Sequence, residues 1–195
     1  LTPVIHAIGD AALRSALDAV EATRASWAAR GLRPRLEHVQ HLHPDDLPRL
    51  ARLGVVASVQ PIHLRFDAPR IRELLPDRLS GAHAWRDLLA QGTRLALGSD
   101  TPVAPPDVLL GIAAALRRED EDGASLEPGQ ALTLDEALAG YTREAAWAIG
   151  WEGRSGQLRP GYDADLALLS GDPRAGLDDL EVAATFKAGR PTFER

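Results

Sequence analysis

The sequence predicts an α/β fold in which four strand–helix units are followed by a short β-rich segment. Over the first two-thirds of the chain, short apolar runs alternate with helix-period patterns, which is typical of parallel βα units. Glycine or proline marks most of the changes from one pattern to the next. After Gly150 the helical periodicity stops. Because a (β/α)8 barrel needs about 250 residues, these units correspond to half a barrel.

The first unit has a short apolar strand within residues 3–8 and a helix from the N-cap candidate Asp10 to the stop at Gly31. In the second unit, the strand spans residues 35–40. Its helix opens near Pro44, a favoured first-turn residue, and ends at Gly54.

The third unit has a strand at residues 55–60, closed by Pro61, an irregular stretch over 62–80 and a helix over 82–90. The fourth has a strand at 94–97 and a helix at 107–118. Thr133 and Glu136 form a capping-box pattern, which predicts a helical region up to about residue 149. Strands are expected in the tail at 164–169, 182–186 and 191–193.

Composition narrows the function classes. The net charge is −6 and the arginines are dispersed, which argues against nucleic acid or an anionic membrane as a partner. No apolar run approaches the roughly 18 residues of a membrane span, and cytoplasm is the expected compartment. The chain has no cysteine, so a metal would be held by nitrogen and oxygen. It also has no methionine, which suggests a processed chain or a fragment.

Three strand ends carry candidate metal ligands, namely His6, His38 and Asp100. In a parallel barrel the carboxyl ends of the strands lie on one rim, so these side chains should converge. Two imidazoles and a carboxylate suit a catalytic zinc site. Asp100 could then move a proton from water to a leaving nitrogen. Taken singly, each histidine could be merely hydrogen-bonded, and Asp100 could be a helix cap.

Other polar residues have simpler explanations. Gln60 and His63 end the third strand on the same rim and are expected to contact substrate. His41 and His43 precede a helix and fit solvated or capping roles. His83 and Trp85 fit a helix that packs on the sheet, and Asp165 in the tail fits a structural role. The acidic run 119–122 fits a solvated loop.

Short motifs of this chain resemble the amidohydrolase superfamily, specifically its amidohydrolase-3 group of YtcJ-like and N-substituted formamide deformylase-like proteins. The motifs span nearly the whole chain in the family's order: 6–10 (HAIGD), 37–40 (EHVQ), 59–63 (VQPIH), 85–89 (WRDLL), 98–102 (GSDTP) and 161–166 (GYDADL). The resemblance implies that the four strands are barrel strands 5–8. It also implies that His6 and His38 are the metal ligands of strands 5 and 6, and that Asp100 is the strand-8 ligand and catalytic acid/base.

The same resemblance implies two domains, with residues 1–150 as the C-terminal half of a TIM-type barrel and 151–195 as part of a small β-sandwich. The family's His-x-His pair of strand 1 and its bridging residue of strand 4 have no counterpart here. We therefore expect the N-terminal half of the barrel to be a missing partner. A bare half barrel has two unpaired sheet edges and should aggregate or form a homo-oligomer.

The predicted function is metal-dependent hydrolysis of carbon–nitrogen bonds, non-peptide and amide-like, in a small molecule. The cofactor is one or two divalent metal ions, with zinc as first choice. One alternative is a non-catalytic remnant that binds no metal productively. Another is a metal-independent barrel enzyme in which His6 and Asp100 form an acid/base pair.

Overall fold

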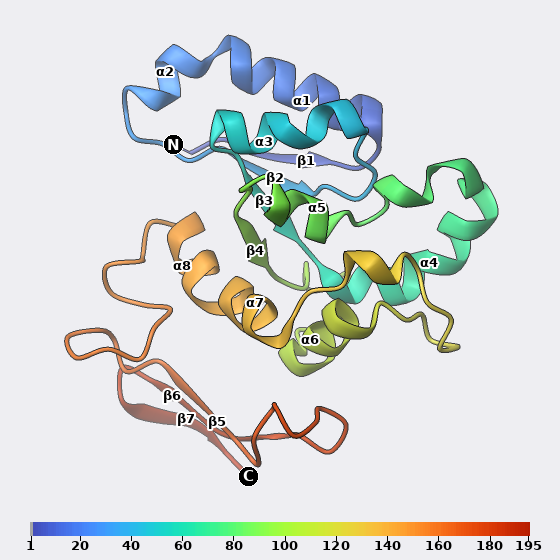
Figure 1. The fold of residues 1–195 in the computed structure, drawn as a ribbon. Helices are drawn as coiled ribbons and strands as arrows, with labels where there is room; N and C mark the ends of the chain where they lie inside the picture. The colour runs from blue at the N-terminus through green and yellow to red at the C-terminus, as the bar shows by residue number, and fades with distance from the viewer. Residues whose placement is uncertain (1) are drawn as a thin grey trace.

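The computed structural model describes residues 2–195, and Leu1, the first residue of the expected first domain, lies outside this range. Its first sheet is parallel, with four strands in the order β1-β2-β3-β4. The second, antiparallel sheet has the order β5-β6-β7 and is set apart from the first (Figure 1). The predicted α/β fold is therefore confirmed, with strands at β1 (Val4–Ala7), β2 (Arg35–His38), β3 (Val56–Val59), β4 (Leu95–Leu97), β5 (Leu166–Leu169), β6 (Val182–Lys187) and β7 (Arg190–Glu194).

Helices connect successive strands of the parallel sheet. The α-helices are α1 (Asp10–Ala22), α2 (Arg24–Ala28), α3 (Leu47–Leu53), α4 (Pro61–Leu74), α5 (Trp85–Ala90), α6 (Val108–Arg117), α7 (Leu134–Ala139) and α8 (Ala145–Ala148). Three short 3₁₀ segments are η1 (Pro44–Asp46), η2 (Pro76–Gly81) and η3 (Pro128–Gln130), and a π-helical turn, η4 (Gly140–Glu144), joins α7 to α8. The predicted capping box is present, because Thr133 and Glu136 bond reciprocally at the start of α7.

The expectations for residues 62–80 and for the first helix are wrong. The stretch 62–80, expected to be irregular, contains α4 and η2. Pro69 lies inside α4, and the helix continues past it because apolar residues at helical spacing, among them Leu64, Ala68 and Ile71, are buried on one face. The first helix was expected to reach Gly31, but it is divided at Thr23, whose hydroxyl donates to the Ala19 carbonyl at 2.8 Å.

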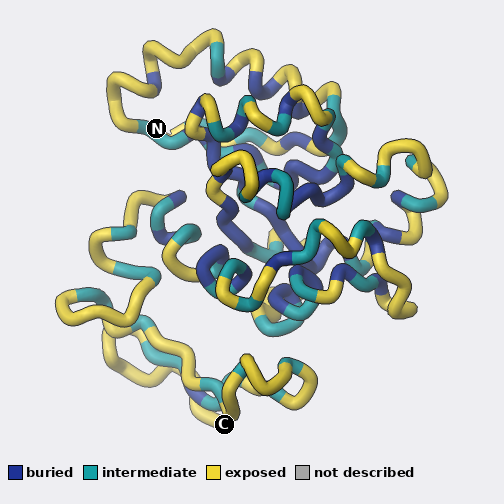
Figure 2. The backbone as a smooth tube through the Cα atoms, viewed as in Figure 1, coloured by how far each residue is buried: buried dark blue, intermediate teal, exposed yellow. Residues whose placement is uncertain are grey.

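Alternation along the strands separates two faces of the parallel sheet. Ile5, Leu36, Ala57 and Leu95 are register neighbours across all four strands. They belong to or pack against the main hydrophobic core under the helices, which is the dark blue region of Figure 2. His6 lies at the alternate register position and is exposed on the other face. One face of the sheet is therefore covered by the main core, whereas the other carries polar side chains and a small contact of Val56 and Ala96 with α8.

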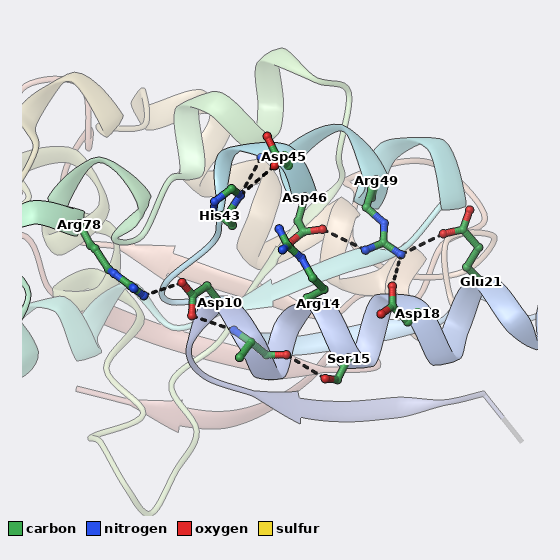
Figure 3. Close-up of polar contacts among 11 residues, drawn as sticks. Asp10, Arg14, Ser15, Asp18, Glu21, His43, Asp45, Asp46, Arg49 and Arg78 are labelled. Carbon is green, nitrogen blue, oxygen red and sulfur yellow. Dashed lines mark hydrogen bonds and ion pairs between the residues drawn. The ribbon is translucent and has the colours of Figure 1, made fainter.

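An ion-pair network fastens α1 to α3 outside the sheet (Figure 3). Asp46 is almost fully buried and accepts from Arg14 Nε and from Arg49 Nη1, each at 2.9 Å. Arg49 also donates to Asp18 at 2.6 Å and to Glu21 at 2.9 Å. Because α1 follows β1 and α3 follows β2, this network links the helices behind the two strands that carry His6 and His38.

The Trp147 ring of α8 contacts two arginines that lie next to the strands of the parallel sheet. The guanidinium groups of Arg33 and Arg94 lie 4.0 and 4.2 Å from the ring centroid of Trp147 in α8. Each arginine also pairs with a carboxylate, Arg33 with Glu152 and Arg94 with Glu144. These cation–π contacts join α8 to the segments that precede β2 and β4.

The tail sheet has little buried surface of its own (Figure 2). An apolar cleft runs between it and the α/β layer, with Ile112, Tyr141, Leu166 and Val182 among the lining residues. Asp165 has the expected structural role, since its carboxylate accepts from the Ala188 N–H at 2.9 Å and pairs with Lys187. Among residues 2–195, no helix is long and apolar enough to cross a membrane.

Candidate metal centre

The carboxyl edge of the parallel sheet carries the polar residues that the sequence singled out. His6 is the third residue of β1, and His38 is the last residue of β2. Gln60 follows β3 directly, and His63 lies in the first turn of α4. Asp100 comes three residues after the end of β4. Because all four strands are parallel, these positions meet at the same edge.

Three of these residues form a compact group. His38, His63 and Asp100 each offer a ligand atom, and these atoms lie within 4.8 Å of one another. The imidazoles of His38 and His63 are stacked, with ring centroids 5.8 Å apart and planes at 19°. His6 lies next to the group, with its ring edge-on to His38 at a centroid distance of 4.5 Å. The structure thus places His63, expected to contact substrate, in the group of possible ligand atoms, whereas His6, expected to be a ligand, lies beside this group.

The electrostatics of the group suit a cation. Burial lowers the pKa of His38, and the neighbouring His6 imidazole lowers it further. A neutral imidazole has a free lone pair, which is the form that binds metals. Within residues 2–195, His38 Nδ1 and His63 Nε2 are buried without a hydrogen-bond partner. Unpaired buried nitrogens are costly, and a bound cation would satisfy them. The donor set of two imidazoles and one carboxylate therefore fits a divalent metal.

The backbone at two of the three residues is strained. His38 has φ 74° and Asp100 has φ 60°, and Val39 follows His38 with φ 49°. Non-glycine residues rarely adopt such values, and the cost is on the order of 1–3 kcal/mol each. In both cases the left-handed residue ends or follows a parallel strand, so it turns the chain and sets the direction of the side chain at the sheet edge.

The segment that carries Asp100 is fixed by several hydrogen bonds. Ser99 Oγ lies 3.1 Å from Thr101 Oγ1, which in turn donates to the Ala104 carbonyl at 2.9 Å. The Asp100 carbonyl accepts from the Val103 N–H at 2.8 Å. These contacts fix the residues around Asp100 and its main chain, whereas Asp100 itself is exposed at the sheet edge.

Behind the group lies a polar layer that sequence reasoning did not assign to the site. Gln40 is buried, and its Nε2 donates to Asp67 Oδ2 of α4 at 2.6 Å and lies 3.5 Å from His83 Nε2. His83, expected in a helix, precedes α5 with φ 50° and is fully buried, which holds its pKa well below the usual value.

His41 was expected to be solvated or capping, but burial lowers its pKa too. His43 does cap, since its Nδ1 accepts from the Asp45 N–H.

Comparison with known proteins identifies the family. The amidohydrolase family profile matches residues 1–193. The chain belongs to the amidohydrolase family. YtcJ of Bacillus subtilis is 36% identical over 98% of this chain and 37% of its own length. N-substituted formamide deformylase of Arthrobacter pascens is 32% identical over 98% of this chain and 36% of its own length. The resemblance to the amidohydrolase-3 group is thereby confirmed.

Among solved structures, an uncharacterized metal-dependent hydrolase from Pyrococcus horikoshii has a TM-score of 0.73 and 32% identity. That match covers 84% of this chain and 32% of the Pyrococcus chain. The chain therefore spans about a third of the length of these amidohydrolase-family relatives.

Proposed function

We propose that this chain is the C-terminal part of a metal-dependent amidohydrolase that cleaves carbon–nitrogen bonds, non-peptide and amide-like, in a small molecule. The observation that carries the proposal is the group of His38, His63 and Asp100 at the carboxyl edge of a parallel sheet. Membership of the amidohydrolase family and similarity to a deformylase of N-substituted formamides support this bond class.

In this proposal β1–β4 are barrel strands 5–8, residues 1–150 form the barrel half, and residues 151–195 form part of a β-sandwich. Three facts support this arrangement. The strands follow one another in chain order in a parallel sheet, as barrel strands do. On the sheet face that carries His6, α8 covers only the part around Val56 and Ala96, and His6 itself is exposed. The tail strands form a separate antiparallel sheet. The missing N-terminal half of the barrel would then be the partner that covers the open face.

The residues of the chain have distinct roles in the proposed reaction. His6, His38 and Asp100 would hold a divalent metal, with zinc as first choice, and the position of His63 makes it a further candidate ligand as well as a substrate contact. Such a metal, when bound, activates water as a nucleophile and polarises a carbonyl. Asp100 would accept the proton of that water and pass it to the leaving nitrogen. The exposure of its carboxylate gives a substrate access to it.

Gln60 and His63 would orient the substrate. Gln60 Nε2 donates to the Ser58 carbonyl at 3.3 Å, and its Oε1 is buried without a partner among residues 2–195. In this proposal the amide oxygen would accept a hydrogen bond from an N–H of an amide-like substrate. The net charge of −6 supports a small molecule, rather than nucleic acid or an anionic membrane, as the partner.

The test is the metal content of the full-length gene product purified under metal-replete conditions, measured by elemental analysis. We expect one or two zinc equivalents in the wild type, and loss of most of this metal or of activity in His38→Ala and Asp100→Asn. The matched control is His43→Ala, since this histidine caps a 3₁₀ turn and is 42% exposed. Wild-type protein without metal would support the non-catalytic remnant instead, and activity that survives a strong chelator would support the metal-independent alternative.

A further inference from the structure

One hydrogen bond connects the two segments that carry His38 and His63. Gln40 follows His38 by two residues, and Asp67 follows His63 by four residues in α4. Residues four apart lie on the same side of an α-helix. The bond from Gln40 Nε2 to Asp67 Oδ2, 2.6 Å long, therefore runs alongside the stacked pair of His38 and His63 and links the same two elements.

Gln40 is held from a second direction. Its main-chain carbonyl accepts from the His83 N–H at 2.8 Å, and its Nε2 lies 3.5 Å from His83 Nε2. The side chain is buried, so water does not compete for the amide. With the backbone fixed to the segment before α5 and the side chain fixed to α4, Gln40 has one orientation, and it holds the end of β2 against the start of α4.

The end of β2 needs such an anchor. His38 and Val39 are consecutive residues with positive φ, and Val39 is β-branched and fully buried. A backbone of this kind persists only where the surroundings over-determine it. The hydrogen bond between Gln40 and Asp67 is the first side-chain bond beyond the turn and reaches directly into the helix that carries His63.

We propose that Gln40 and Asp67 are positioning residues that hold His38 and His63 at the separation needed to bind a metal. The inference rests on the metal site of the proposed function and adds to it a pair of residues that would not touch the metal. The loss of a direct outer partner of a metal ligand lowers metal affinity by about 10- to 100-fold. The bond between Gln40 and Asp67 joins these two residues and not His38 or His63 themselves, so we expect an effect near the lower end, about 10-fold, when it is broken.

Isosteric substitutions in the full-length protein can break the bond and then restore it. Gln40→Glu replaces the donor with a carboxylate that faces the Asp67 carboxylate. Asp67→Asn keeps an oxygen that can accept from Gln40. The double variant Q40E/D67N restores the bond in the opposite direction, because the amide introduced on α4 can donate to the carboxylate introduced after β2, and it keeps the wild-type charge. The control on the same helix is Glu73→Gln, whose side chain is 61% exposed.

The dissociation constant for zinc, measured by competition with a chromophoric chelator, is the main readout, and the cobalt(II) absorption spectrum reports the geometry of the site. We expect weaker binding and an altered spectrum in Q40E alone, and near wild-type values in D67N, Q40E/D67N and E73Q. Unchanged zinc affinity in Q40E, or failure of the double variant to recover, would overturn the inference while the metal site stands. A wild-type protein that binds no zinc would overturn the proposed function and this inference with it.

Discussion

Removal of the Asp46 carboxylate should destabilise the fold by about 3 kcal/mol. Its side chain is 2% exposed and forms two charge-assisted hydrogen bonds of 2.9 Å, to Arg14 and Arg49 (Figure 3). A hydrogen bond to a charged group contributes about 1.5–3 kcal/mol. Arg49 is only 16% exposed, so about 2 kcal/mol is expected from its bond. Arg14 is 46% exposed, and solvent screening reduces its contribution to about 1 kcal/mol.

The assay is urea unfolding of Asp46→Ala, followed by circular dichroism, with Asp45→Ala as the matched control. Asp45 is the preceding residue and the same residue type, but its side chain is 81% exposed. We expect the control to lie within about 0.5 kcal/mol of the wild type, as is usual for surface substitutions. A loss below about 1 kcal/mol in Asp46→Ala would refute the reasoning.

A double-mutant cycle separates the pair from the rest of the network. Asp46→Ala and Arg49→Ala, alone and combined, should give a coupling energy of about 2 kcal/mol. Arg49 keeps Asp18 and Glu21 as partners when Asp46 is removed, so it does not become an unpaired charge. Additive effects of the two substitutions would mean that the bond to Arg49 contributes nothing, and that Asp46 acts through Arg14 and packing.

Two further predictions concern other charged groups. Two hydrogen bonds from Arg86 lower the pKa of Glu136 to about 2, below its ordinary 4.5, so the contribution of Glu136 to stability is fully present above pH 4.5 and is lost as the pH falls towards 2. Both side chains are about a third exposed, so the loss of stability should be about 1 kcal/mol. Glu136→Gln should remove this part of the pH dependence of urea unfolding. The same pH profile in the variant and the wild type would contradict the prediction. Arg118 is fully buried and donates to three main-chain carbonyls, while burial lowers its pKa to about 10. Arg118→Met should lower the free energy of unfolding by about 3 kcal/mol, because it leaves these carbonyls unpaired. The control Arg117→Met, at a side chain 43% exposed, should change it little. Equal losses of stability in urea unfolding of the two variants would contradict this prediction.

Strands β1, β3 and β4 could be predicted because each is a short, mostly apolar run bounded by glycine, proline or polar residues, whereas β2 (RLEH) is mostly polar and was predicted from its place in the alternating pattern. Helix α4 could not, because Pro69 in its interior ordinarily indicates a break. Burial of one face of α4 against the core overrides that local signal. The sequence reports the proline, whereas the packing that compensates for it depends on residues far away in the chain.

Candidate site residues that lie at the ends of strands could be predicted, whereas those whose position depends on helix packing could not. His6, His38 and Asp100 lie at or after strand ends, and parallel strands bring their carboxyl ends to one edge. The assignment of these three as ligands stays a prediction. The approach of His63 to His38 depends on where α4 begins, and the bond of Gln40 to α4 depends on the packing of that helix. Neither distance can be obtained from sequence spacing.

The left-handed residues at the sheet edge have a consequence for protein design. A designer who copied His38 and Asp100 onto regular strands of an ideal barrel would give them negative φ, and both side chains would leave the edge in another direction. Glycine would adopt the turn at little cost but would supply no ligand. A transplant of this constellation therefore has to include the turn at 38–39 and the 98–104 segment as units, together with the contacts that hold them.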